Sequence, residues 1–242
     1  FLLYRMNQAM WTLLVFIYWI LIAFLNLIPI AGPLIATLLL PAFSVSFMEM
    51  CRELEEHRPI RPVLLLAGLR RQLPTLITLG GLYLLSIMMV LGMSTLADEG
   101  VLANWIIFGD APGAKALRDG SLSRALFVAA IAGTPVVMAF WFAPVLSAWE
   151  GMNALKALFF SFFAGWRNWR AFLVYGAVLS ILGVAFSAAI VTAAILLGGK
   201  NQVLRFGMIV AVLVSMPTLF GSFFAAYRDV FPHSPSGEDR AT

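Results

Sequence analysis

Apolar residues in this chain fall into six long runs, separated by short polar or proline-containing stretches. A helix needs about 20 residues to cross the hydrocarbon core of a bilayer, and each run is close to that length or longer. Inside lipid, a single run satisfies its own backbone hydrogen bonds only as a helix. The pattern therefore predicts an all-α integral membrane helical bundle with six transmembrane helices, at about 10–28, 33–50, 75–96, 124–149, 171–197 and 204–227.

Two shorter apolar stretches between these runs are predicted to form interfacial elbow helices. Residues 63–73 would make a helix of about 16 Å, roughly half the thickness of the hydrocarbon core. In residues 152–170, leucine and aromatic side chains share one side of a helical wheel, which is typical of an amphipathic helix at a membrane surface. The other side holds Asn153, Lys156, Ser161, Arg167 and Asn168.

A repeated arrangement predicts internal symmetry. Three runs contain a proline about ten residues before a polar end, and these are predicted helix kinks at Pro41, Pro144 and Pro217. The elbows also align, with Ala67-Gly68-Leu69-Arg70 matching Ala164-Gly165-Trp166-Arg167. We predict one transmembrane domain over 1–242, with related halves at about 10–96 and 124–227 and a disordered tail over 231–242.

The composition narrows the class of protein. With 62% hydrophobic and 12% charged residues, the chain has too few polar side chains to coat a soluble globule. Its basic residues are scattered at helix ends, so nucleic-acid binding is not expected. The sequence contains no G-x-S-x-G, H-E-x-x-H or C-x-x-C motif. We therefore predict no enzymatic activity, no cofactor and no metal site.

The distribution of positive charge predicts the orientation. If the amino terminus is cytoplasmic, eleven Lys and Arg residues fall on the cytoplasmic side and five on the other. The positive-inside rule then places both termini in the cytoplasm, with the chain crossing the membrane several times. Because the chain begins at Phe1 rather than at a methionine, further residues upstream are expected.

Five short motifs carry a resemblance to a known family. They are Ile28-Pro29-Ile30-Ala31-Gly32, Leu40-Pro41-Ala42, Cys51-Arg52-Glu53-Leu54, Trp141-Phe142-Ala143-Pro144 and Arg167-Asn168-Trp169-Arg170-Ala171-Phe172. Over nearly its whole length the chain resembles an uncharacterised family of six-span proteobacterial inner-membrane proteins, a domain of unknown function. That resemblance implies a multi-pass, six-span protein of the bacterial inner (cytoplasmic) membrane, but no established activity. The end of the sixth run is also similar to the membrane domain of some bacterial glycerophosphodiester phosphodiesterases, which implies proximity to lipid.

Two groups of residues are candidate contact sites. Cations on the cytoplasmic side would attract anionic lipid head groups or an acidic partner, although they also fit the ordinary positive-inside signal. They are Arg70, Arg71, Lys156, Arg167 and Arg170. In the loop over 97–121, an apolar cluster is predicted to enter the outer membrane interface or to contact another protein. It consists of Trp105, Ile106, Ile107 and Phe108.

These features predict a non-catalytic membrane protein, either a partner-binding accessory subunit or a lipid-contacting scaffold. Its partners would be membrane lipids, and either another membrane protein complex or a second copy of the chain. Two ladders of small residues would allow close helix contact, either within the chain or between copies. They are Ala125, Ala129 and Gly133, and Ala185, Ala189 and Ala193.

Two other functions remain as alternatives. The first is a passive or exchange transporter of a small molecule or lipid, with a central cavity at the level of the three proline kinks. A polar pocket at that level would favour it. The second is an enzyme that acts on lipids, which would need Glu49, Glu150 and His57 to cluster in one cleft.

Overall fold

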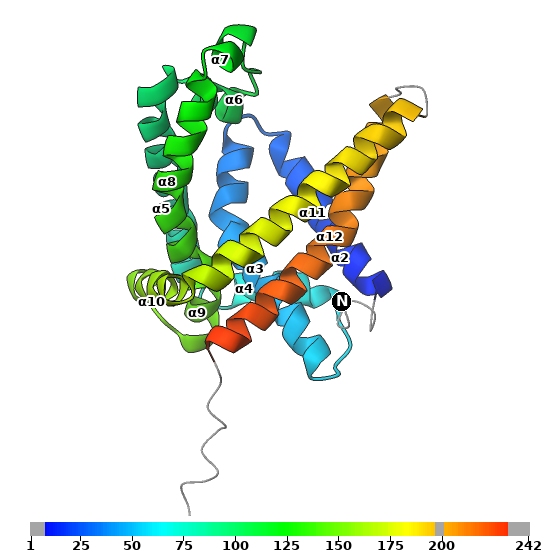
Figure 1. The fold of residues 1–242 in the computed structure, drawn as a ribbon. Helices are drawn as coiled ribbons and strands as arrows, with labels where there is room; N and C mark the ends of the chain where they lie inside the picture. Colours follow the sequence, from blue (N-terminus) through cyan, green and yellow to red (C-terminus); the bar gives the residue numbers. More distant parts are fainter. Residues whose placement is uncertain (1–7, 197–200, 232–242) are drawn as a thin grey trace, which may run out of the picture. The chain divides into compact units, whose positions relative to one another are not determined.

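The computed structural model describes residues 8–196 and 201–231, which form helices and connecting turns without a β-strand. Figure 1 shows these elements as a ribbon coloured along the sequence. The elements are α2 (Gln8–Asn26), α3 (Ala31–Glu55), the 3₁₀ helix η1 (Pro62–Leu66), α4 (Ala67–Arg70), α5 (Leu73–Asp98), α6 (Val101–Phe108), α7 (Ala114–Arg118), α8 (Ser121–Trp141), α9 (Ala143–Glu150), α10 (Ala154–Arg167), α11 (Trp169–Leu196) and α12 (Asn201–Val230). The prediction of an all-α protein is confirmed.

Five helical segments among the described residues are long and apolar enough to cross a membrane. They are Ala9–Asn26, Ala31–Glu55, Leu73–Asp98, Ser121–Glu150 and Trp169–Leu196. The sixth predicted span falls on α12, part of which lies outside the residues whose side chains are described, so a count of six stays a prediction. The predicted disordered tail also lies outside the described residues, apart from Phe231.

The described residues divide into two compact units. Unit 1 comprises residues 8–29, 43–70, 167–196 and 201–231, and unit 2 comprises residues 30–42 and 71–166. Each unit takes segments from both halves predicted from the sequence, and α3 contributes to both units. The two units defined by contacts thus differ from the two halves predicted from the sequence, and the relation between those halves stays a prediction.

In unit 1, aromatic rings join α2, the second part of α3, and α12. Phe47 stacks on Trp11 of α2 with ring centroids 5.9 Å apart and on Phe220 of α12 at 4.7 Å. Helices α11 and α12 pack side by side (Figure 1), and the hydroxyls of Tyr175 and Ser222 lie 2.7 Å apart between them. Aromatic contacts and a hydroxyl pair therefore contribute to the packing of this unit.

In unit 2, α5 and α8 run side by side along much of their length (Figure 1). Gly80 of α5 lies directly against the backbone of Leu38 in α3. The predicted ladder on α8 also packs within this unit, because Ala125 is buried against Leu102 and Ala129 packs beside it. The α8 ladder thus supports contact within the chain.

A buried carboxylate sets the start of α6 at one end of unit 2. Asp98 accepts hydrogen bonds from the N–H groups of Gly100, at 2.9 Å, and Leu102, at 2.6 Å. It thereby caps amide groups that the first turn of a helix leaves without partners. With Leu102 packed inward, the residues from Trp105 to Phe108 are exposed.

Replacing that carboxylate should loosen α6. We expect Asp98→Ala to destabilise the helix by about 0.5–2 kcal/mol, because one buried and one partly buried N–H group lose their acceptor. Amide hydrogen exchange over residues 101–108 should become faster, while exchange in α11 stays unchanged. Asp98→Asn retains a carbonyl acceptor and should have a smaller effect. Equal exchange rates in wild type and Asp98→Ala would contradict the capping role.

Candidate functional site

Helix α10, the elbow predicted within residues 152–170, is held in unit 2 by its small side chains. The buried positions follow the helical spacing i, i+3, i+7 and i+11, and they are Ala154, Ala157, Ser161 and Gly165. Small residues at this spacing allow two helix backbones to approach closely. The polar face predicted for this elbow is therefore not wholly polar surface, because Ser161 is fully buried.

Ser161 is inserted into the backbone of the fourth span, between α8 and α9. Its Oγ accepts a hydrogen bond from the N–H of Phe142 at 2.9 Å and donates one to the carbonyl of Met138 at 2.8 Å. In an uninterrupted helix the Phe142 N–H would bond the Met138 carbonyl directly, since the two residues are four apart. A side chain inserted in this way is a recognised cause of helix bending.

The sequence around this break explains why it occurs there. Pro144 occupies the first turn of α9, where its missing N–H and its ring disrupt the regular pattern of the preceding turn. The carbonyl of Phe142 still accepts a bond from Leu146 at 2.9 Å, so α9 starts normally. Pro41 and Pro217, by contrast, lie inside continuous helices, and kinks at these two positions stay predictions.

Gly165 allows the close approach of α10 to the end of α8. A β-carbon at this position would lie 3.2 Å from Cγ and 3.3 Å from Cβ of Met138. Such contacts are tighter than packed cores normally tolerate. Gly165 and Ser161 therefore both contact Met138, and they fix α10 at the break.

The opposite face of α10 is apolar, aromatic and exposed. Leu155 is 73% exposed, Phe159 59% and Trp166 62%. The rings also contact each other, with Phe159 and Phe163 at a centroid distance of 4.6 Å. Aromatic side chains gathered on one helix face are typical of a helix that lies in a membrane interface.

Three predicted cations lie on α10 or at the start of α11, and all three are exposed. The Lys156 Nζ lies 5.9 Å from the centre of the Phe160 ring, and the Arg170 guanidinium lies 5.5 Å from the Trp169 ring. Arg167 ends α10. Among the described residues, none of the three takes part in an ion pair within 4.0 Å that the structure records.

The first elbow is shorter than predicted and differs in form. Residues 63–73 fold as η1 and the single turn α4, and Gln72 then adopts a left-handed conformation with φ of 50°. The buried N–H of Gly68 donates to Ser46 Oγ on α3 at 2.9 Å. A serine hydroxyl thus links each elbow to a proline-containing span. Arg70 and Arg71 are exposed beyond this contact.

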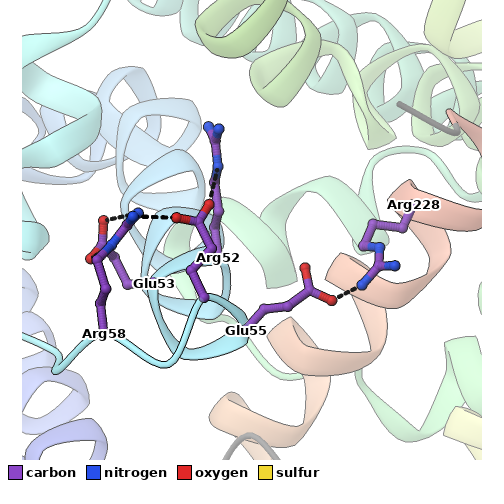
Figure 2. Close-up of polar contacts among 6 residues, drawn as sticks. Arg52, Glu53, Glu55, Arg58 and Arg228 are labelled. Carbon is purple, nitrogen blue, oxygen red and sulfur yellow. Dashed lines mark hydrogen bonds and ion pairs between the residues drawn. The ribbon is translucent and has the colours of Figure 1, made fainter. Parts of the chain in front are cut away.

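Charged residues at the end of α3 form ion pairs, which Figure 2 shows. Arg52 Nε lies 3.3 Å from Glu56 Oε1. Arg58 donates two hydrogen bonds to Glu53, at 2.7 and 2.9 Å, and also pairs with Glu56. The hydrogen bonds to Glu53 raise the pKa of Arg58. Neighbouring carboxylates therefore offset the positive charge of these arginines.

A further ion pair joins two elements of unit 1. Arg228, near the end of α12, pairs with Glu55 at the end of α3 (Figure 2). Both side chains are partly exposed, so the pair contributes at most about 1 kcal/mol to stability. The cations of α10 and α11 are thus cleaner candidates for an external anion than the arginines near the end of α3.

The remaining predicted groups are placed as follows. The five candidate cations divide between the units, with Arg70, Arg167 and Arg170 in unit 1 and the other two in unit 2, so their predicted convergence stays a prediction. The three residues that a lipid-acting enzyme would need are also divided between the units, with Glu49 and His57 in unit 1 and Glu150 in unit 2. Among the described residues, no group of three or more His, Cys, Asp or Glu side chains has a geometry suited to a metal ion.

A shallow, open pocket lies in unit 2 between the end of α5 and the start of α8. Its lining consists of Leu96, Ala97, Ser123, Arg124, Phe127 and Val128. These residues lie at the α6 and α7 end of the unit, and none of them is a kink proline. The pocket therefore gives no support to a transport cavity at the proline level.

The structure also adds site residues that sequence reasoning did not assign. The apolar pattern does not mark Ala154, Ala157 and Gly165 as an interface, and it places Ser161 on the polar side. Their spacing within one amphipathic segment was the available signal, because small residues mark the contact face of membrane helices.

The helices described above define a multi-pass membrane protein. Comparison with known proteins agrees: the chain is 36% identical over 254 residues to a probable inner membrane protein of Burkholderia thailandensis, an alignment that covers 98% of this chain and 93% of the relative. The chain belongs to the family of that protein. No family model and no solved structure matches it, and no comparison supports the likeness to glycerophosphodiester phosphodiesterases.

Proposed function

We propose that this protein is a non-catalytic, lipid-contacting scaffold of the inner membrane, with α10 as its lipid-contacting element. The observation that carries the proposal is the division of α10 into two faces. Its small residues are buried, with Ser161 and Gly165 in contact with the fourth span, and its aromatic face remains exposed. A helix fixed to a span in this way presents large apolar rings to the boundary between head groups and acyl chains.

Charge specifies the lipid class. Lys156, Arg167 and Arg170 are exposed at the two ends of α10 and just beyond it. Each cation near a membrane surface contributes about 1 kcal/mol of attraction to anionic lipid. The long side chains of lysine and arginine can lie along the aromatic face while the charged groups reach the phosphates. Anionic phospholipids are therefore the proposed ligands.

Native mass spectrometry of the purified protein tests this proposal. The protein would be mixed with equal amounts of phosphatidylglycerol and phosphatidylcholine, which differ in net charge. We expect preferential retention of phosphatidylglycerol. Equal retention of the two lipids would overturn the assignment of anionic lipid. A second polypeptide bound in stoichiometric amount, with no lipid retained, would overturn the scaffold proposal in favour of an accessory subunit.

The proposed topology places α10 on the cytoplasmic side, and cysteine labelling can test it. In a Cys51→Ala background, Arg170→Cys and Lys115→Cys introduce thiols at exposed positions. We expect a membrane-impermeant maleimide to label Lys115→Cys in intact spheroplasts and Arg170→Cys only after the membrane is opened, because the positive-inside rule puts the larger set of cations inside. The reverse pattern would show the opposite orientation.

A further inference from the structure

The break in the fourth span depends on a side chain from another helix. Backbone groups freed at a break in a membrane helix are satisfied by neighbouring helices, by Ser or Thr side chains or by water. Here the two backbone groups at the break, the Phe142 N–H and the Met138 carbonyl, both bond the hydroxyl of Ser161 on α10. The hydroxyl suits this position because it donates and accepts at the same time.

Movement of α10 would therefore change the hydrogen bonding at the break between α8 and α9. If α10 shifts away from α8, Ser161 withdraws from both partners, and the Phe142 N–H must find the Met138 carbonyl, water or no partner. Gly165 makes the contact sensitive to small shifts, because its backbone already lies close against Met138. Packed contacts of this kind switch between discrete arrangements rather than deforming continuously.

We infer that Ser161 is a positioning residue that couples lipid contact by α10 to the conformation of the break between α8 and α9. This inference rests on the proposed function of α10 as a lipid-contacting helix. Anionic lipid that draws α10 into the interface keeps Ser161 in place and protects the Phe142 amide. Without anionic lipid, α10 is held less firmly and the break opens more often.

Amide hydrogen exchange of the full chain in nanodiscs tests the coupling. Nanodiscs of phosphatidylcholine alone would be compared with nanodiscs of equal parts phosphatidylcholine and phosphatidylglycerol. For the wild type we expect slower exchange in the mixed nanodiscs both in α10 and over residues 138–146. For Ser161→Ala we expect the response in α10 to remain and the response over 138–146 to be lost. Ser161→Thr keeps a hydroxyl and should retain both responses.

Ser94→Ala is the matched control. Ser94 is also fully buried, but its hydroxyl bonds Leu91 within the same helix at 2.7 Å, so this variant should keep both responses. A wild type in which α10 responds and residues 138–146 do not would overturn the coupling and leave the proposed function intact. If neither segment responds, lipid contact by α10 and the coupling both fail. An unchanged response over 138–146 in Ser161→Ala would exclude Ser161 as the link.

Discussion

Gly80→Ala should lower the free energy of unfolding by at least about 1–3 kcal/mol, the usual range for overpacking a tight contact. A β-carbon at this position would lie 2.3 Å from the carbonyl oxygen of Leu38 and 2.7 Å from its Cα. Both of these are backbone atoms, so no side chain can rotate to make room. Helix α5 would have to move away from α3, and contacts along unit 2 would weaken.

Gly92→Ala provides a control on the same helix. Among the described residues, no heavy atom beyond the chain neighbours and the local helix backbone lies within 4 Å of a β-carbon at Gly92, and alanine is a better helix former than glycine. This variant should therefore be neutral or slightly stabilising. Both proteins can be compared by thermal unfolding in one detergent. Equal midpoints for Gly80→Ala and wild type would show that α3 and α5 are not in close contact at Gly80.

Removing the three cations of the proposed lipid site should have a comparably large effect, this time on binding. For the triple variant Lys156→Gln, Arg167→Gln and Arg170→Gln, we expect a loss of about 3 kcal/mol in the preference for phosphatidylglycerol, at about 1 kcal/mol per charge. That loss corresponds to roughly a hundredfold change in the ratio of affinities. Competition between the two lipids in native mass spectrometry measures this ratio directly.

The matched control removes the same number of charges elsewhere. Lys115, Arg118 and Arg124 are exposed on α7 and α8, and changing all three to Gln alters the net charge equally. If the preference arises at α10, this control should retain it. An equal loss in both triple variants would instead indicate a general effect of net charge. High salt should reduce the wild-type preference, because surface electrostatics are screened.

Much of the fold could be predicted because the thickness of the bilayer sets the length of each apolar run in a membrane protein. The run predicted at 75–96 is the helix Leu73–Asp98, for example. The run predicted at 33–50 continues to Glu55, because hydropathy falls where charged residues begin while the helix extends beyond the apolar core. Gln72, in a left-handed conformation, ended the first elbow earlier than its apolar pattern indicated.

The contact between α10 and the fourth span was harder to predict, because a helical-wheel pattern is defined mainly by the large apolar side chains. Phe159 and Trp166 dominate that pattern, yet they are exposed, and the recorded contacts with the span are made by a serine and a glycine. In a membrane, large apolar residues face the lipid tails as readily as the protein interior, whereas small residues favour close packing between helices. The partner atoms of Ser161 could not be predicted, since they depend on the break at Phe142.

The two backbone bonds made by Ser161 also restrict which sequences this family can use at that position. The gap between Phe142 and Met138 accepts only a group that both donates and accepts a hydrogen bond and that is no larger than a short side chain. Serine and threonine meet this requirement. Alanine or glycine would meet it only with a trapped water molecule in place of the hydroxyl. Relatives that share the break should therefore vary within this narrow set, and a bulky apolar residue here should coincide with an uninterrupted fourth helix.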